Sequence, residues 1–303
     1  MTGSAGLAPA LNATLEVLST TAGGVALYYG GTETTQDSAL PPILLVHSIN
    51  AAGSAAEMAP LFDYYRPSRN VYALDLPGFG HSDRTDRAYL PRLMTNAILA
   101  CLECISARHG GAAVDVVALS LSGEYAVRAQ TEQPQRVRRL ALISPTGFNG
   151  KPRRYGPAGA TLGQTWLYSL LTKPVWRDAL FSGLTRPGVI RYFLQRSWGS
   201  KQIDEALWRY DVLTTRQAGA AHAPFYFLSA YLFSRDINAL YEALQCPVWV
   251  SMATRGDFTD YRGRYTVEGR SNWQFHLVEG GALPYFEDLG AFVARLDPFL
   301  AAP

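Results

Sequence analysis

A serine at the end of an apolar run is the first residue whose position suggests chemistry. Residues 114–123 read VDVVALSLSG, so Ser120 follows a predicted strand and precedes a helix-forming stretch. A strand, a sharp strained turn and a helix expose the oxygen of the central serine, provided that the residues two positions away are small. Ala118 and Ser122 meet that need. Ser120 is therefore a candidate nucleophile, although such a short pattern also arises by chance.

The elements that must position Ser120 form an alternating series. Short apolar runs separated by helical patterns indicate crossover connections on a largely parallel sheet, the architecture of an α/β protein. The predicted strands are Thr14–Ser19, Val25–Tyr29, Ile43–Val46, Asn70–Leu74, Val114–Leu119, Val137–Ile143, Val248–Met252 and Trp273–Val278. The predicted helices of this series are Ala55–Tyr65, Pro91–Arg108, Ser122–Gln133 and Pro284–Leu300.

Residues 148–244 break the series, because they carry helical patterns without a further strand. We expect residues 1–147 and 245–303 to form the core and residues 148–244 to form a helical cap. Residues 151–245 hold 16 of the 36 aromatic side chains. This favours a cap with an apolar underside or, equally, rings that simply pack the cap onto the sheet. Trp166 and His222 are the candidate substrate-binding residues of the cap.

Composition excludes several classes of protein. The chain of 303 residues is 48% hydrophobic and 17% charged with a net charge of +2, which favours a globular domain and gives no general field for nucleic acid. Apolar runs are strand-sized, far short of the roughly 20 residues that cross a bilayer. Cys101, Cys104 and Cys246 lack the partners of a metal site, and no cofactor motif is visible. Residues 1–10 lack the basic start of a secretory signal, which predicts a flexible leader and a cytoplasmic protein.

Two further motifs resemble those of the α/β-hydrolase family. Residues 46–50 (VHSIN) are similar to the His-Gly turn after the family's third strand, with Ser48 in the glycine position, and residues 75–82 (DLPGFGHS) match its D-x-P-G-x-G-x-S loop. The resemblance runs from about residue 25 to residue 300. It implies an α/β-hydrolase fold with helices on both faces of the sheet, and a serine hydrolase of the esterase type. It also implies an oxyanion hole made by the amides of Ile49 and Leu121, with His47 and Ser48 near the substrate.

The family places a carboxylate in the turn after the strand Val248–Met252. Asp257 is the first choice for this triad acid, and Asp260 lies close enough to compete. A structural alternative is that Asp257 simply begins a helix through its side chain.

The histidine of the triad is missing. Relatives carry G-x-G-H-x-P followed by Glu-Asp, whereas residues 279–288 read EGGALPYFED and place Ala282 in the histidine position. A serine without a general base is a weak nucleophile. His276 should project from a sheet face, while His222 could hang over the pocket as a substitute base. His47, His81 and His109 are expected to be structural.

Two functions from different classes remain. If Ala282 is an engineered change, the chain is a hydrolase of an apolar small-molecule ester with its base removed. If Ala282 is natural, the chain is a ligand-binding pseudoenzyme, or a cyclase or isomerase that uses the lidded cavity. Eight basic residues accompany the single acid Asp178 between Lys151 and Ser200. They suggest an anionic acyl compound or a membrane surface as a partner, although a solvated surface is the simpler reading.

Overall fold

The central element is an eight-stranded sheet, in a computed structural model that describes residues 6–31 and 40–302. Its strand order is β1-β2-β4-β3-β5-β6-β7-β8. β1 and β2 are antiparallel to each other, β2 is antiparallel to β4, and the remaining neighbours are parallel. The strands are β1 (Thr14–Thr20), β2 (Gly23–Gly30), β3 (Ile43–Val46), β4 (Val71–Leu74), β5 (Val114–Leu119), β6 (Val137–Ile143), β7 (Val248–Ala253) and β8 (Trp273–Val278). Every predicted strand is confirmed, with ends that differ by at most two residues.

Burial explains why these segments form strands at these places. β3, β4 and β5 are buried at every position, as expected of central parallel strands covered on both faces. β1 lies at the edge of the sheet and no residue in it is fully buried. The fold class predicted from the alternating pattern is confirmed.

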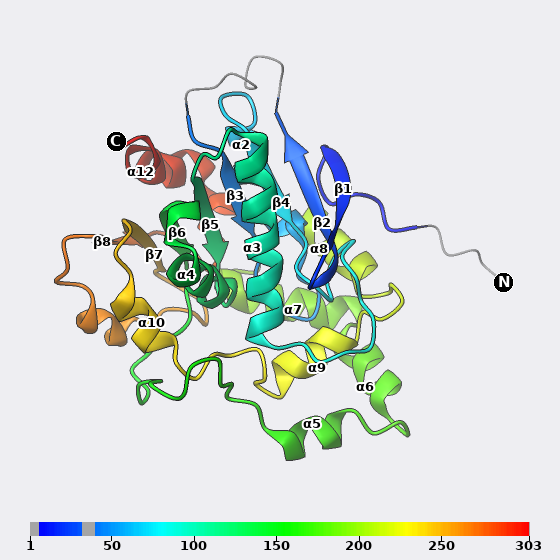
Figure 1. Cartoon of the computed structure of the whole chain (residues 1–303). Helices are drawn as coiled ribbons and strands as arrows, with labels where there is room; N and C mark the ends of the chain where they lie inside the picture. The colour runs from blue at the N-terminus through cyan, green and yellow to red at the C-terminus, as the bar shows by residue number, and fades with distance from the viewer. Residues whose placement is uncertain (1–5, 32–39, 303) are drawn as a thin grey trace.

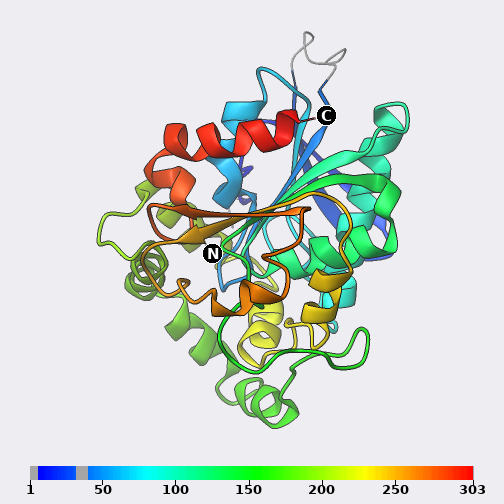
Figure 2. The same cartoon turned by 90° about the vertical axis from the view of Figure 1, so that its left-hand side faces the viewer.

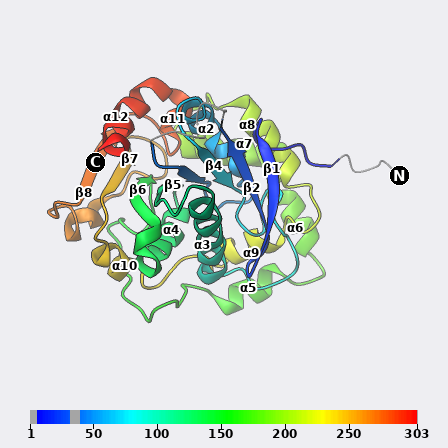
Figure 3. The same cartoon turned by 45° about the horizontal axis from the view of Figure 1, so that its top comes forward.

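Helices cover both faces of the sheet, as Figures 2 and 3 show. One face packs against α3 (Pro91–Arg108), α4 (Ser122–Glu132) and α10 (Ile237–Ala243). The other face packs against α2 (Ala59–Tyr65), α11 (Pro284–Glu287) and α12 (Leu289–Ala301). The prediction of one helix over Pro284–Leu300 is wrong. Asp288 interrupts it with an extended φ of −144°, and its side chain accepts a hydrogen bond from the Ala291 N–H to begin α12.

Residues 148–244, which we call the helical segment, connect β6 to β7. Besides α10, its helices are α5 (Thr165–Leu171), α6 (Arg177–Leu184), α7 (Pro187–Trp198), α8 (Glu205–Thr214) and α9 (His222–Leu228). Its β structure is a single isolated bridge between Thr161 and Ser234. Figure 1 shows α5, α6 and α9 together beyond one end of the sheet. The division into a core and a cap at residues 148 and 244 stays a prediction.

Some expectations concern segments beyond the sheet and its helices. Within residues 6–31 and 40–302, no helix is long and apolar enough to cross a membrane. In the same ranges no group of three or more His, Cys, Asp or Glu side chains could hold a metal ion. The three cysteines are free thiols. The predicted flexible leader, residues 1–10, lies partly outside the described residues, which begin at residue 6.

Candidate active site at Ser120

Ser120 occupies the turn between β5 and α4. Its φ is 57°, in the left-handed region that costs a residue with a side chain about 1–3 kcal/mol. Its N–H donates to the Ile143 carbonyl at the end of β6, with an N···O distance of 2.8 Å. The strained turn predicted for a nucleophile is therefore present at Ser120. The catalytic role of the hydroxyl stays a prediction.

The two small residues beside this turn are both buried. Ala118 contributes to the core, and Ser122 is fully buried with a hydroxyl that donates to the carbonyls of Leu119 (2.8 Å) and Val46 (3.3 Å). A serine therefore fits beside this turn, because its hydroxyl finds partners at the ends of β5 and β3.

Glu57 holds the turn formed by His47–Asn50. It lies in the 3-10 helix η1 (Ala55–Met58) and is 4% exposed. Its carboxylate accepts hydrogen bonds from the Ser48 N–H (2.6 Å), the Ser48 hydroxyl (3.0 Å) and the Asn50 side-chain amide (2.7 Å). No sequence pattern singles out Glu57, because it lies outside both motifs and only the folded chain brings it to Ser48.

His47 joins this turn to the one that follows β4. Its Nε2 accepts a hydrogen bond from the Leu76 N–H (2.9 Å), so Nδ1 carries the proton and donates to the Ser48 carbonyl (2.6 Å). The ring is fully buried. His47 thus has a structural position between the two turns, and neither ring nitrogen is left for proton transfer at Ser120.

The amides proposed as the oxyanion hole belong to the buried residues Ile49 and Leu121. Leu121 immediately precedes α4, where helix N–H groups lack partners within the helix. Within the described parts of the chain, neither the Ile49 N–H nor the Leu121 N–H donates to another protein group. Both donors are thus available to a ligand oxygen, although the pairing of the two stays a prediction.

Asp75 explains the glycine-rich motif at residues 75–82. Its fully buried carboxylate accepts hydrogen bonds from the N–H groups of Ala55 (2.7 Å) and His81 (2.8 Å) and from the Tyr28 hydroxyl (3.2 Å). Gly80 has a φ of +48°, and a Cβ there would lie 2.0–2.2 Å from the Asp75 carboxyl atoms. The motif therefore supports the turn indirectly, by anchoring the start of the 3-10 helix that carries Glu57.

Ala282 lies against the end of α7. It is 4% exposed, and its N–H donates to the Ser197 carbonyl at 2.8 Å. A Cβ at the preceding residue, Gly281, would lie 2.4 Å from the Trp198 carbonyl oxygen. Backbone at the end of α7 therefore packs directly against Gly281 and Ala282.

Asp257 is bound by the same helix. Its carboxylate forms a two-point ion pair with the Arg196 guanidinium, with both N···O distances 2.8 Å, and its side chain is 42% exposed. Its N–H also donates to the Arg196 carbonyl at 3.3 Å. Asp260, the competing candidate, pairs with Arg262, which lowers the pKa of that carboxyl. No sequence pattern marks Arg196 as the partner of Asp257.

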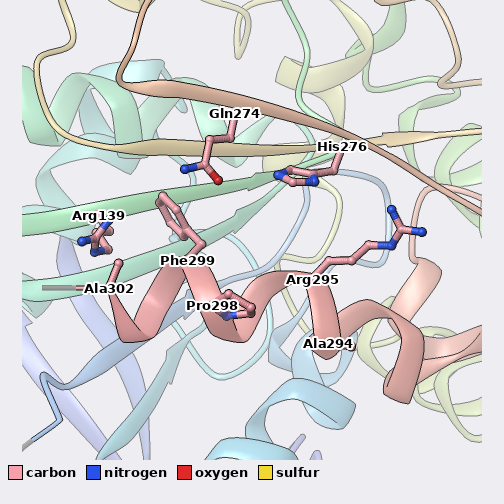
Figure 4. Close-up of a pocket in the computed structure, with 8 residues that line it drawn as sticks. All are labelled: Arg139, Gln274, His276, Ala294, Arg295, Pro298, Phe299 and Ala302. Atoms are coloured by element: carbon pink, nitrogen blue, oxygen red, sulfur yellow. The ribbon is translucent and has the colours of Figure 1, made fainter.

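The contacts of the other candidates involve residues outside the Ser120 turn. His222 begins α9 and its Nδ1 lies 3.4 Å from an Asp86 carboxylate oxygen. His276 projects from β8 toward α12 and lines the pocket that Figure 4 shows. Its ring stacks on the Trp249 ring, with the two ring centroids 5.3 Å apart. Burial and the nearby Arg295 lower the pKa of His276. Trp166 lies on α5 with 67% of its surface exposed, so its predicted contact with substrate gains no support from burial.

Asp211 is a buried acid that sequence inspection does not single out. It lies on α8, which packs on η1, and is 2% exposed. Its Oδ1 is buried without a hydrogen-bond partner among the described residues. Burial, and then the charge of Glu57, raise the pKa of Asp211 well above its usual range. The helical segment thus presents a carboxyl that favours its neutral form to the residue that holds the His47–Asn50 turn.

A serine on a strained turn after a central strand, in a mostly parallel sheet covered on both faces, defines a protein of the α/β-hydrolase class. The model of the alpha/beta hydrolase family matches residues 43–296. The chain belongs to this family.

Sequence similarity to individual relatives is low and covers only part of this chain. The chain is 30% identical over 112 residues to abhydrolase domain-containing protein abhd-5.2 of Caenorhabditis elegans, a match that covers 36% of this chain and 24% of that protein. It is 28% identical over 129 residues to 2-hydroxymuconate semialdehyde hydrolase of Pseudomonas putida, which covers 42% of each. The chain therefore matches less than half the length of either relative. The structure of Cfl2 from Burkholderia cenocepacia is similar with a TM-score of 0.72 at 19% identity, over 94% of this chain and 95% of that one.

Proposed function

We propose that this chain binds a small apolar carbonyl compound at Ser120 and does not hydrolyse it by the histidine-dependent route. In this proposal the Ile49 and Leu121 amides hold the carbonyl oxygen, and the helical segment acts as a cap over the ligand. Neither a metal nor a nucleic acid takes part. A cytoplasmic location is part of the same proposal.

One observation carries the proposal, namely the environment of Ala282. Its side chain is packed in the core and its N–H is bonded to Ser197, so an imidazole there would have to displace buried neighbours. Overpacking of that kind typically costs about 1–3 kcal/mol. The Asp257 carboxylate, which would orient a histidine, is paired with Arg196 instead. The helical segment thus engages both Ala282 and the candidate triad acid Asp257.

Two measurements test this proposal. Calorimetry with 2-undecanone, a ketone without a leaving group, should detect binding that the Ser120→Leu variant loses. Turnover of p-nitrophenyl esters from acetate to decanoate should rise less than tenfold in Ala282→His, relative to the Ser120→Ala blank. Ala218→His, which places an imidazole at an exposed alanine, controls for background imidazole catalysis. Absence of ketone binding in the unaltered chain would overturn the proposal.

The second candidate is a serine hydrolase, and the conformation of Ser120 favours it. A left-handed φ at a serine is costly, and such strain clusters at functional sites. One relative, 2-hydroxymuconate semialdehyde hydrolase of Pseudomonas putida, is a hydrolase and points the same way. A Ser120-dependent gain of a hundredfold or more in Ala282→His would favour this candidate, because restoring a general base typically contributes about 10²–10⁴ in rate.

A further inference from the structure

A cavity of about 910 Å³ lies between the helical segment and the loops that follow β6 and β7. Its wall includes Pro145–Gly147 after β6 and Asp257, Phe258, Asp260 and Tyr261 after β7, and the helical segment supplies the rest. Ser120 and the His47–Asn50 turn are not part of the lining. The volume is within the range of about 300–1,000 Å³ that small-molecule sites occupy.

Four cations line this cavity, and they come from two separate stretches of the helical segment. Lys151, Arg153 and Arg154 lie just after the β6 loop, whereas Arg235 lies more than 80 residues later, near the start of α10. The fold therefore gathers them.

Only one of the four cations is neutralised. Arg154 pairs with Glu124 of α4 at 2.6 Å. Arg153 donates to the Thr266 hydroxyl and the Gly263 carbonyl, and Arg235 donates to the Thr161 carbonyl. In residues 6–31 and 40–302, no carboxylate forms an ion pair with Lys151, Arg153 or Arg235.

The two acids in the wall do not offset this charge, because each has its own arginine. Asp257 is bound by Arg196, and Asp260 is bound by Arg262. A ligand in this cavity would lie against Lys151, Arg153 and Arg235, whose charges are not paired with a carboxylate. These cations favour an anionic ligand, since charge-assisted hydrogen bonds are roughly twice as strong as neutral ones.

The rest of the lining is largely apolar. It includes Leu162, Phe233 and Phe258, together with the rings of Tyr155 and Tyr261. Tyr261 is 6% exposed, and burial raises its pKa to about 12, so the ring presents a neutral surface. The wall thus combines a cationic side with an aromatic and aliphatic side.

We propose that this cavity binds a small amphipathic organic anion, with its carboxylate or phosphate group toward Lys151, Arg153 and Arg235 and its apolar body against Phe233 and Phe258. The site goes beyond the proposed function, because none of its lining residues belongs to the Ser120 turn. It also assigns Asp257 a place in a ligand-binding wall rather than in a proton relay.

Calorimetry on the full chain tests this site with three probes of equal chain length: octanoate, octyl phosphate and uncharged 1-octanol, which has no carbonyl group for the Ser120 site. At least one of the two anions should bind ten or more times as tightly as 1-octanol, and the affinity should fall as NaCl rises from 50 to 500 mM. The two anions distinguish a carboxylate site from a phosphate site. Equal binding of 1-octanol, or no binding of either anion at 5 mM, would overturn the proposal.

Variants locate the site. Lys151→Gln/Arg153→Gln/Arg235→Gln should weaken anion binding at least tenfold. The matched control Lys173→Gln/Arg186→Gln/Arg216→Gln removes the same net charge from exposed positions outside the lining and should change affinity less than twofold. Equal losses in both triples would refute a local site.

Two single variants complete the design. The triple variant also removes a hydrogen bond of the fold, because Arg153 donates to the Gly263 carbonyl. The single variant Lys151→Glu avoids that contact, and it should weaken binding about tenfold without altering the thermal melt. Ser120→Ala should leave anion binding unchanged. A loss there would mean that the anion occupies the Ser120 site and not the cavity.

Discussion

Removing the Glu57 carboxylate should destabilise the protein strongly, because three donors depend on it. The Ser48 N–H, the Ser48 hydroxyl and the Asn50 amide all donate to this one side chain, at 2.6, 3.0 and 2.7 Å. Hydrogen bonds to charged groups contribute about 1.5–3 kcal/mol each. Relaxation of the turn and entry of water reduce the sum, so Glu57→Ala should lower the free energy of unfolding by about 3–5 kcal/mol, because it leaves these donors without an acceptor.

Glu57→Gln is the matched control. The glutamine retains one acceptor oxygen, but its NH₂ group must face one of the donors that Glu57 now accepts from. The Asn50 amide cannot turn to offer its oxygen instead, because its Oδ1 already accepts from the Ala52 N–H at 2.6 Å. The expected cost is about 1–3 kcal/mol, for one orphaned buried donor.

Urea denaturation at pH 7 measures both variants. A Glu57→Ala variant within about 0.5 kcal/mol of the unaltered chain would refute the assignment of Glu57 as the residue that holds the turn.

Three further changes probe the contacts of the helical segment. An acid whose pKa is raised by folding destabilises the folded state increasingly as pH rises above its unfolded pKa of about 4. Asp211→Asn should therefore raise Tm more at pH 8 than at pH 5, and equal shifts would contradict a neutral Asp211. Asp236→Ala leaves the Arg128 guanidinium without its partner, and the side chains of Arg128 and Asp236 are only 5% and 6% exposed. It should lower the free energy of unfolding in urea by about 3–5 kcal/mol, whereas loss of a surface pair would cost less than about 1 kcal/mol. Gly281→Ala places a Cβ 2.4 Å from the Trp198 carbonyl oxygen and should lower stability by about 1–3 kcal/mol; an unchanged melt would show that α7 does not press on this segment.

Much of the core could be predicted because its signals are local. A strand buried on both faces needs a nearly continuous apolar run, so β3 and β5 match their predicted bounds. The bounds of β6 and of the less buried edge strand β8 also match their predictions. The turn at Ser120 is equally local, since small residues two positions away decide whether the chain can bend there. The break at Asp288 escaped this reasoning because one extended residue interrupts an otherwise helical pattern.

The sequence by itself determined the fold class, the strained turn at Ser120 and the absence of histidine at position 282, because each depends on residue types within a short stretch. Only the tertiary structure decided what surrounds them. Glu57 reaches Ser48 across nine residues, and Arg196 reaches Asp257 across 61. The cations of the cavity likewise converge from distant stretches. Such pairings depend on how the helical segment packs against the strand ends, and no local pattern records that packing.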